Sequence, residues 1–241
     1  MDYPRFYRDW ISSGLVNFSV KEGETDIFIS AEKDLKDEAG RFIRSLRKEI
    51  EDYIRKNPGF KTSLKPLPPD NKAPGIIKSM LNAGRFAGVG PMASVAGAIS
   101  QFAGNGLLEF TREVILENGG DIFLKRTKET KIGIFAGESP VTGKLSIRIK
   151  PESTPLGVCT SSGTVGHSLS FGIADSVTVL AKDAAVSDAA ATAACNLVKS
   201  PADMEKALNF AKSIEGVTGC MVIYKEKIGS IGDIELIRGN L

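Results

Sequence analysis

The chain has 241 residues, of which 42% are hydrophobic and 25% are charged, a balance typical of a globular rather than a disordered protein. Its 31 basic and 29 acidic residues leave a formal net charge of +2, which gives no overall reason to expect a nucleic acid or an anionic membrane as a partner. No segment approaches the roughly 18 consecutive apolar residues that would indicate a membrane-spanning helix.

The cysteines and the first residues indicate where the protein works. Cys159, Cys195 and Cys220 are far apart, odd in number and without a CxxC pairing. This pattern favours reduced thiols over a zinc site or a disulfide framework. The sequence begins with charged and aromatic residues, where a signal peptide would need an apolar core. We therefore expect a cytoplasmic protein.

The first quarter of the chain changes from strand spacing to helix spacing. Apolar residues predict two short strands at 15–20 and 26–30, joined by a hairpin turn at 21–25. Segment 35–56 then has apolar residues on one helical face and charges on the other. Its basic residues could form an anion-binding stripe, but interleaved acidic residues favour a solvated helix face. The prolines and glycines of 57–75 predict a connector without regular structure.

The composition changes sharply after the connector. Segment 73–107 contains seven glycines and only two charged residues, Lys78 and Arg85. Small residues let the backbone approach a ligand closely, and exposed backbone N–H groups can hold an anion. Strands are predicted at 113–117, 121–125, 131–136 and 145–150. A charge-poor region follows, with a strand near 156, a Ser/Thr/Gly loop, a buried strand at 176–180 and an alanine-rich helix at 184–198. A helix at 201–213 and two closing strands, at 219–224 and 234–237, complete the chain.

This order of elements predicts an α+β fold of mixed or antiparallel sheets with packed helices. We expect residues 1–241 to form a single domain or two intertwined subdomains, with 57–75 as the proline-rich connector. The sequence gives no sign of its oligomeric state.

Three short segments contain residues that could take part in binding or catalysis. The first is ENGGD at 117–121. Gly119 and Gly120 permit positive φ or a ligand against the backbone, and Asp121 places a carboxylate beside them. The alternative is a hairpin turn of the Asn-Gly type with a capping aspartate.

The second segment is CTSSGTVGHS at 159–168, which contains five hydroxyls, two glycines and the chain's one histidine. Such a loop can offer hydroxyl and backbone donors to phosphate oxygens, through Ser161, Ser162, Gly163 and Thr164. His167 is a candidate acid or base. The alternative for His167 is a structural residue whose hydrogen bonds are satisfied internally.

The third segment is SDAAATAAC at 187–195, where Asp188 and Thr192 are four residues apart and therefore project from one helical face. A carboxylate and a hydroxyl on one face can hold a hard cation such as Mg²⁺, which prefers oxygen ligands and bridges to substrate phosphates. The alternative is that Asp188 only stabilises its helix N-terminus and Thr192 packs among alanines.

The ordered set of these motifs resembles the ApbE-like flavin transferases. The matching segments are GPMASVAG (90–97), NGGDI (118–122), TSSGT (160–164), His167, SVTVLA (176–181) and SDAAATAA (187–194). The resemblance implies that Asp188 and Thr192 bind Mg²⁺, with a backbone carbonyl of the small-residue segment, best matched by Ala93. It also implies cleavage of the FAD pyrophosphate and attachment of FMN to a Ser or Thr of an acceptor protein.

Two departures from the family pattern separate the functional hypotheses. The family's histidine opens H-x-x-D-P-x-T-G, whereas this chain reads HSLSFG at 167–172, and Ala96 stands where a lysine is common. The first hypothesis is an Mg²⁺-dependent enzyme acting on FAD or a related dinucleotide. The second is a non-catalytic module that binds a flavin, a nucleotide or a protein partner. A scaffold subunit is a third alternative, with the glycine-rich segment as a helix-packing surface.

Overall fold

The computed structural model describes residues 8, 14–164 and 171–239. Within these residues, the strands are β1 (Val16–Glu22), β2 (Thr25–Ala31), β3 (Val114–Asn118), β4 (Asp121–Lys125), β5 (Thr130–Gly133), β6 (Leu145–Ile149), β7 (Leu156–Ser161), β8 (Ser176–Ala181), β9 (Val217–Tyr224), β10 (Lys227–Gly232) and β11 (Leu236–Arg238). An eight-stranded sheet has the order β1-β2-β3-β4-β7-β8-β9-β10, and a three-stranded sheet has the order β11-β6-β5. All of these pairings are antiparallel.

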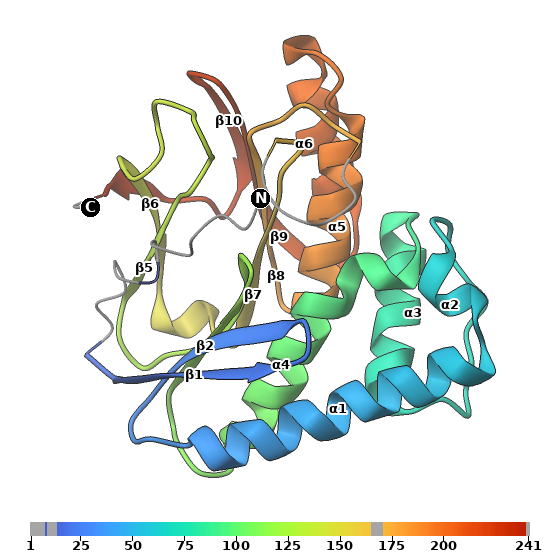
Figure 1. The fold of residues 1–241 in the computed structure, drawn as a ribbon. Coiled ribbons are helices and arrows are strands. Elements are labelled where there is room, and N and C mark those ends of the chain that lie inside the picture. The colour runs from blue at the N-terminus through green and yellow to red at the C-terminus, as the bar shows by residue number, and fades with distance from the viewer. Residues whose placement is uncertain (1–7, 9–13, 165–170, 240–241) are drawn as a thin grey trace.

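The helices lie on one face of the long sheet and the small sheet lies on the other (Figure 1). They are α1 (Lys36–Lys56), α2 (Gly59–Thr62), α3 (Gly75–Ala87), α4 (Val95–Leu107), α5 (Ala184–Leu197) and α6 (Met204–Ser213), with short 3₁₀ turns η2 (Pro91–Ser94), η3 (Pro151–Ser153) and η4 (Pro201–Asp203). The larger apolar core fills the helical side, and a smaller core joins the two sheets. The predicted α+β class, with antiparallel sheets and packed helices, is confirmed.

Most predicted elements are present, and the differences have local causes. The connector at 57–75 contains one helical turn, α2, because Phe60 is buried there against Tyr53, with ring centroids 5.1 Å apart. The sequence analysis predicted no helix at α3 or α4, because it described that segment only by its small residues. It also missed β10, whose residues are largely exposed and which pairs only with β9. An exposed edge strand lacks the apolar alternation that reveals a half-buried one. In the described part of the chain, no helix is both long and apolar enough to cross a membrane.

Small residues bring α4, α5 and the sheet into close contact. A Cβ atom on Gly97 of α4 would lie 2.3 Å from the carbonyl oxygen of Ala184 at the start of α5. A Cβ atom on Gly157 of β7 would lie 2.4 Å from the Cα atom of the same Ala184. Ser187 fixes α5 to the sheet, since its hydroxyl accepts from the Cys159 N–H and donates to a β8 carbonyl. The start of α5 therefore packs directly on β7 and on the start of α4.

All three cysteines are buried, and we expect them to resist alkylation in the folded protein. Burial raises the pKa of the Cys220 thiol to about 12 and that of Cys159 well above its usual range. Because the thiolate is the reactive form, iodoacetamide at mildly alkaline pH should label the native chain slowly and the urea-unfolded chain at all three cysteines. Mass spectrometry would count the labels. Rapid labelling of Cys159 or Cys220 in the native chain would contradict this packing.

Candidate functional site

Asp188 lies inside α5 and not at its N-terminus. The N-cap of α5 is Asp183, whose side chain accepts hydrogen bonds from the N–H groups of Ala185 and Val186. The alternative that Asp188 only stabilises its own helix N-terminus is therefore wrong. Asp188 and Thr192, one helical turn apart, are only 9% and 8% exposed.

The carboxylate of Asp188 caps a different helix. Its Oδ2 accepts the N–H of Gly97 at 2.9 Å, in the first turn of α4, which has no side-chain cap of its own. The first N–H groups of a helix lack intrahelical partners and favour a negative charge. Burial raises the pKa of Asp188 to about 7, while the N–H groups of Gly97 and Ala96 favour the ionised form and oppose that shift. The site thus holds a buried carboxylate against the glycine-rich segment.

The ENGGD segment forms a tight turn beside that helix terminus. Gly119 and Gly120 have φ values of 70° and 104°, and Asn118 pairs with Asp121 across them. Two consecutive positive-φ residues define the hairpin turn that the sequence left as an alternative. The Asn118 side-chain amide donates to the carbonyl of Ala96 at 3.4 Å, so the turn is tied to the start of α4. The predicted cofactor contact of the two glycines stays a prediction.

Asp121 is a second buried carboxylate at this place. Its side chain is 9% exposed, and its Oδ1 has no hydrogen-bond partner among the described residues. Burial raises its pKa well above the usual range, and the charges of Asp188 and Glu117 raise it further. The thiol of Cys159 and the N–H of Thr160 act in the opposite direction. Asp121 and Asp188 are therefore close enough to influence each other's ionisation.

The hydroxyl residues of the TSSGT segment divide into buried and exposed positions. Ser161 ends β7, is 4% exposed, and its Oγ has no partner within the described chain. Ser162 is half-buried and Thr164 is exposed, and the Ser162 hydroxyl accepts the Thr164 N–H at 3.1 Å. The Thr164 hydroxyl donates to Asp175 at 3.4 Å. Gly163 has no room for a side chain, because an added Cβ would lie 2.0 Å from the Gly172 carbonyl oxygen.

The structure does not test the predicted roles of His167 and Ala93. His167 falls within 165–170, outside the described residues, so its catalytic role stays a prediction. Ala93 lies in η2, which packs against α5, and its N–H donates to the carbonyl of Gly90 at 3.1 Å. Its contribution to a metal site also stays a prediction.

The structure brings together the start of α4, the Asn118–Asp121 turn, the end of β7 and the middle of α5. The Ser100 hydroxyl of α4 adds a further link, donating to the Asp121 carbonyl at 3.2 Å. The sequence analysis missed two residues of this cluster, Gly97 as the partner of Asp188 and Cys159 as the neighbour of Asp121. Gly97 lies within the segment noted for its small residues, but no nearby residue in the sequence indicates that its N–H bonds to Asp188.

The side chains gathered here suit a hard cation. The unpartnered oxygens of Asp121 and Ser161 are buried polar atoms that a cation would satisfy. Carboxylate and hydroxyl oxygens are the ligands that Mg²⁺ prefers, and Mg²⁺ keeps several waters of its own. In the described chain, no three or more His, Cys, Asp or Glu side chains gather in a metal-binding group. A cation would therefore need hydroxyl, carbonyl or water ligands beside the two aspartates.

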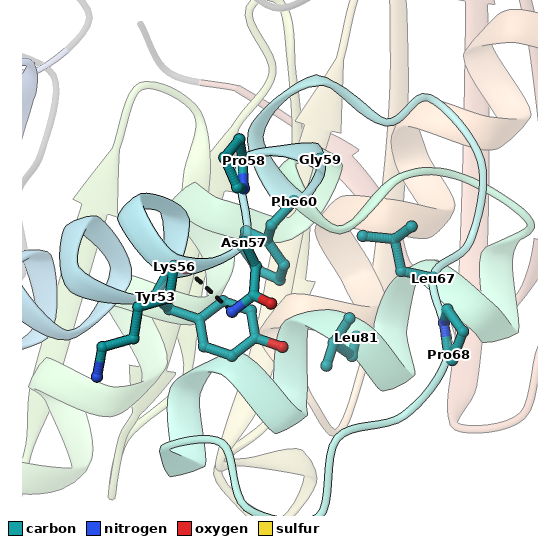
Figure 2. A pocket seen from close by; sticks show the side chains of 9 residues that line it. All are labelled: Tyr53, Lys56, Asn57, Pro58, Gly59, Phe60, Leu67, Pro68 and Leu81. Carbon is teal, nitrogen blue, oxygen red and sulfur yellow. Dashed lines mark hydrogen bonds between the residues drawn. The ribbon is translucent and has the colours of Figure 1, made fainter.

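A separate pocket of about 440 Å³ lies at the end of α1 (Figure 2). It is lined by Tyr53, Lys56 and Phe60, by Leu67 and Pro68 of the connector, and by Leu81 of α3, among others. The Tyr53 hydroxyl already donates to Asp70 at 3.0 Å. None of the predicted site residues contributes to this lining, so the candidate site is not this pocket.

Comparison with known proteins identifies the family and the fold. A family model described as "AbpE bacteria" matches residues 8–232. The chain belongs to this ApbE-like family. Among its relatives, UPF0280 protein MJ1526 of Methanocaldococcus jannaschii is 45% identical over 89% of this chain and 90% of its own length. A UPF0280 protein of Methanococcus vannielii is 42% identical over 95% of this chain and 91% of its own length. The chain therefore falls in a divergent, uncharacterised branch of the family.

Solved structures share the fold at much lower sequence identity. A variant of the flavin transferase ApbE from Vibrio cholerae has a TM-score of 0.57 and 12% identity, over 90% of this chain and 97% of that one. The flavinyl transferase ApbE of Pseudomonas stutzeri has a TM-score of 0.54 and 13% identity, over 90% of this chain and 94% of that one. At this identity the likeness establishes the ApbE-like fold.

Proposed function

We propose that this ApbE-like protein binds FAD or a related dinucleotide together with Mg²⁺ and transfers FMN to a Ser or Thr of an acceptor protein. The observation that supports this most strongly is the buried Asp121–Asp188 pair at the N-terminus of α4, with an unpartnered carboxylate oxygen. The structural neighbours from Vibrio cholerae and Pseudomonas stutzeri are named as flavin transferases. We further propose that the transfer takes place in the cytoplasm.

In this proposal, Asp188, Thr192 and the backbone carbonyl of Ala93 would hold Mg²⁺. A metal ion at a pyrophosphate stabilises the charge that develops as the bond breaks. The aspartate and the threonine are on one face of α5 and almost fully buried, so they are fixed in place before any ligand binds. The capping bond from Gly97 holds the Asp188 carboxylate in one orientation.

The loops beside the metal site would bind the rest of the dinucleotide. The hydroxyls of half-buried Ser162 and exposed Thr164 can donate to phosphate oxygens, and the Gly119–Gly120 turn presents backbone without side chains. His167 would accept the proton of the acceptor hydroxyl as it attacks the phosphorus. AMP would leave as FMN becomes attached to the acceptor oxygen.

A second candidate function is a binding module without turnover. It is favoured by the sequence after the histidine, which lacks the Asp-Pro pair of the ApbE pattern and reads HSLSFG at 167–172. Such a module would hold a flavin or a nucleotide through the same loops, or a protein partner, and would release no AMP.

The test compares the wild type with Asp188→Asn. The amide retains an oxygen that can accept the Gly97 N–H, so the helix cap survives while the charge is lost. FAD with Mg²⁺ should raise the melting temperature of the wild type. At an FAD concentration 100 times the dissociation constant, binding should increase the free energy of unfolding by about 2.7 kcal/mol. Asp188→Asn should lose this rise and any Mg²⁺-dependent AMP release from FAD, measured by chromatography.

The matched control is Asp233→Asn, which removes the same charge at an exposed position between β10 and β11. It should behave like the wild type. Stabilisation by FAD without AMP release, when candidate acceptor proteins are supplied, would support the binding module instead. The absence of any shift with FAD, FMN, ADP or AMP would contradict both functions.

A further inference from the structure

The buried carboxylates of this protein differ in the groups that offset their negative charge. Glu113 forms an ion pair with Arg126 at 3.2 Å, and Glu117 forms one with Arg8 at 2.7 Å. Asp188 accepts N–H groups from the first turn of α4. Asp121 alone among these four has an oxygen without a partner in the described chain. A buried charge or polar atom without a hydrogen-bond or ionic partner destabilises the fold. We therefore expect a bound ligand to satisfy this Asp121 oxygen.

A second unpartnered oxygen lies on the same face of the sheet. Asp121 of β4 pairs with Cys159 of β7, and Ser161 is two residues further along β7. Residues two apart on a strand project to the same side, and Cys159 faces the helices. The Ser161 side chain is therefore directed, like that of Asp121, beneath the helical layer, and both oxygens are buried without partners.

The helix above these two residues is α5, which carries Asp188. The Ser187 hydroxyl accepts the Cys159 N–H at 3.1 Å, so the residue next to Asp188 is bonded to the β7 residue opposite Asp121. Helix α4 links the two aspartates as well, since its Gly97 N–H donates to the Asp188 carboxylate and its Ser100 hydroxyl donates to the Asp121 carbonyl. No ion pair within the described residues includes either aspartate. The two carboxylates and the Ser161 hydroxyl therefore lie where β4, β7, α4 and α5 meet.

We propose that Asp121 and Ser161 are additional oxygen ligands of the divalent cation that Asp188 and Thr192 bind. This inference rests on the metal site of the proposed function and extends it from helix α5 to the sheet. The cation would neutralise both carboxylates and satisfy the two unpartnered oxygens. A ligand set of two carboxylates and two hydroxyls selects a hard cation such as Mg²⁺ or Mn²⁺. The cation would also join β4, β7 and α5, so its binding would stabilise the fold.

The experiment measures Mn²⁺ binding to the metal-free protein without any flavin, by electron paramagnetic resonance and calorimetry. Asp121→Asn should weaken Mn²⁺ binding by about 10-fold or more, as loss of a charged ligand or its support does in metal sites. Ser161→Ala should weaken it by a smaller factor. Asp233→Asn, which removes an exposed aspartate charge elsewhere, should bind Mn²⁺ like the wild type. Saturating Mn²⁺ should raise the melting temperature of the wild type more than that of Asp121→Asn.

Melting the same variants in EDTA distinguishes the loss of a metal ligand from misfolding. Asp121→Asn removes a buried charge that has no cationic partner, so in EDTA it should melt no lower than the wild type. If Asp121→Asn binds Mn²⁺ as tightly as the wild type, the inference is wrong and the proposed function is unaffected. If Mn²⁺ binding depends on Asp121 but FAD neither binds nor is cleaved, the proposed function is wrong and the inference holds. A wild type that binds no Mn²⁺ would overturn both.

Discussion

Gly97→Ala is expected to destabilise the protein by about 3 kcal/mol, at the upper end of the usual cost of overpacking a core. The added Cβ would lie 2.3 Å from the carbonyl oxygen of Ala184 and 2.9 Å from the Cβ of Asp188. Real Cβ atoms do not approach other atoms this closely, so α4 and α5 would have to separate. Neither contact is with the end of a flexible side chain that could rotate away. Urea unfolding monitored by circular dichroism would measure the loss.

The same substitution should weaken Mn²⁺ and FAD binding, because the N–H of Gly97 orients the Asp188 carboxylate. The matched control is Gly59→Ala in α2, where an added Cβ meets no heavy atom within 4 Å. That variant should change the free energy of unfolding by less than about 1 kcal/mol. If Gly97→Ala is no less stable than Gly59→Ala, the close approach of α4 and α5 described above is wrong.

Local patterns were enough to predict most of the strands and the helices α1, α5 and α6, but not α3 and α4. The β1–β2 hairpin, α1 and the β3–β4 pair have apolar residues at strand or helix spacing, and these elements are confirmed within a residue or two. The patterns failed where burial comes from contacts distant in sequence or is nearly absent. The single turn α2 depends on Phe60 packing against α1, and β10 is an exposed edge with little apolar alternation.

The candidate site was predictable only in part, for a related reason. The spacing of Asp188 and Thr192 is local and could be recognised on one helix face. The partner of Asp188 is Gly97, which is 91 residues away along the chain. Which groups surround the Asp121 carboxylate, whose Oδ1 has no hydrogen-bond partner in the described chain, depends on the register between β4 and β7. That register places Cys159 opposite Asp121. Helix propensity and strand alternation carry no information about either contact.

The compensation of buried charge can be tested directly at Glu113, where the structure supplies an arginine. Arg126→Met should lower the free energy of unfolding by about 3–5 kcal/mol, because it leaves a buried carboxylate without its cation. The two side chains are only 4% and 9% exposed, and the Arg126 Nη1 is 3.2 Å from a Glu113 carboxylate oxygen. Methionine keeps much of the apolar stem of arginine, so the loss would come mainly from the charge.

The matched control is Arg112→Met, which breaks the ion pair between Arg112 and Glu32. In this pair the Arg112 side chain is 86% exposed and the Glu32 side chain is 32% exposed. Solvent screens such a pair, so its loss should cost less than about 1 kcal/mol. Adding Glu113→Gln to Arg126→Met should recover part of the lost stability, since it removes the stranded charge. Equal losses from Arg126→Met and Arg112→Met would contradict the view that this protein must compensate its buried carboxylates. That view is also the physical basis for expecting a cation at Asp121, which has no arginine of its own.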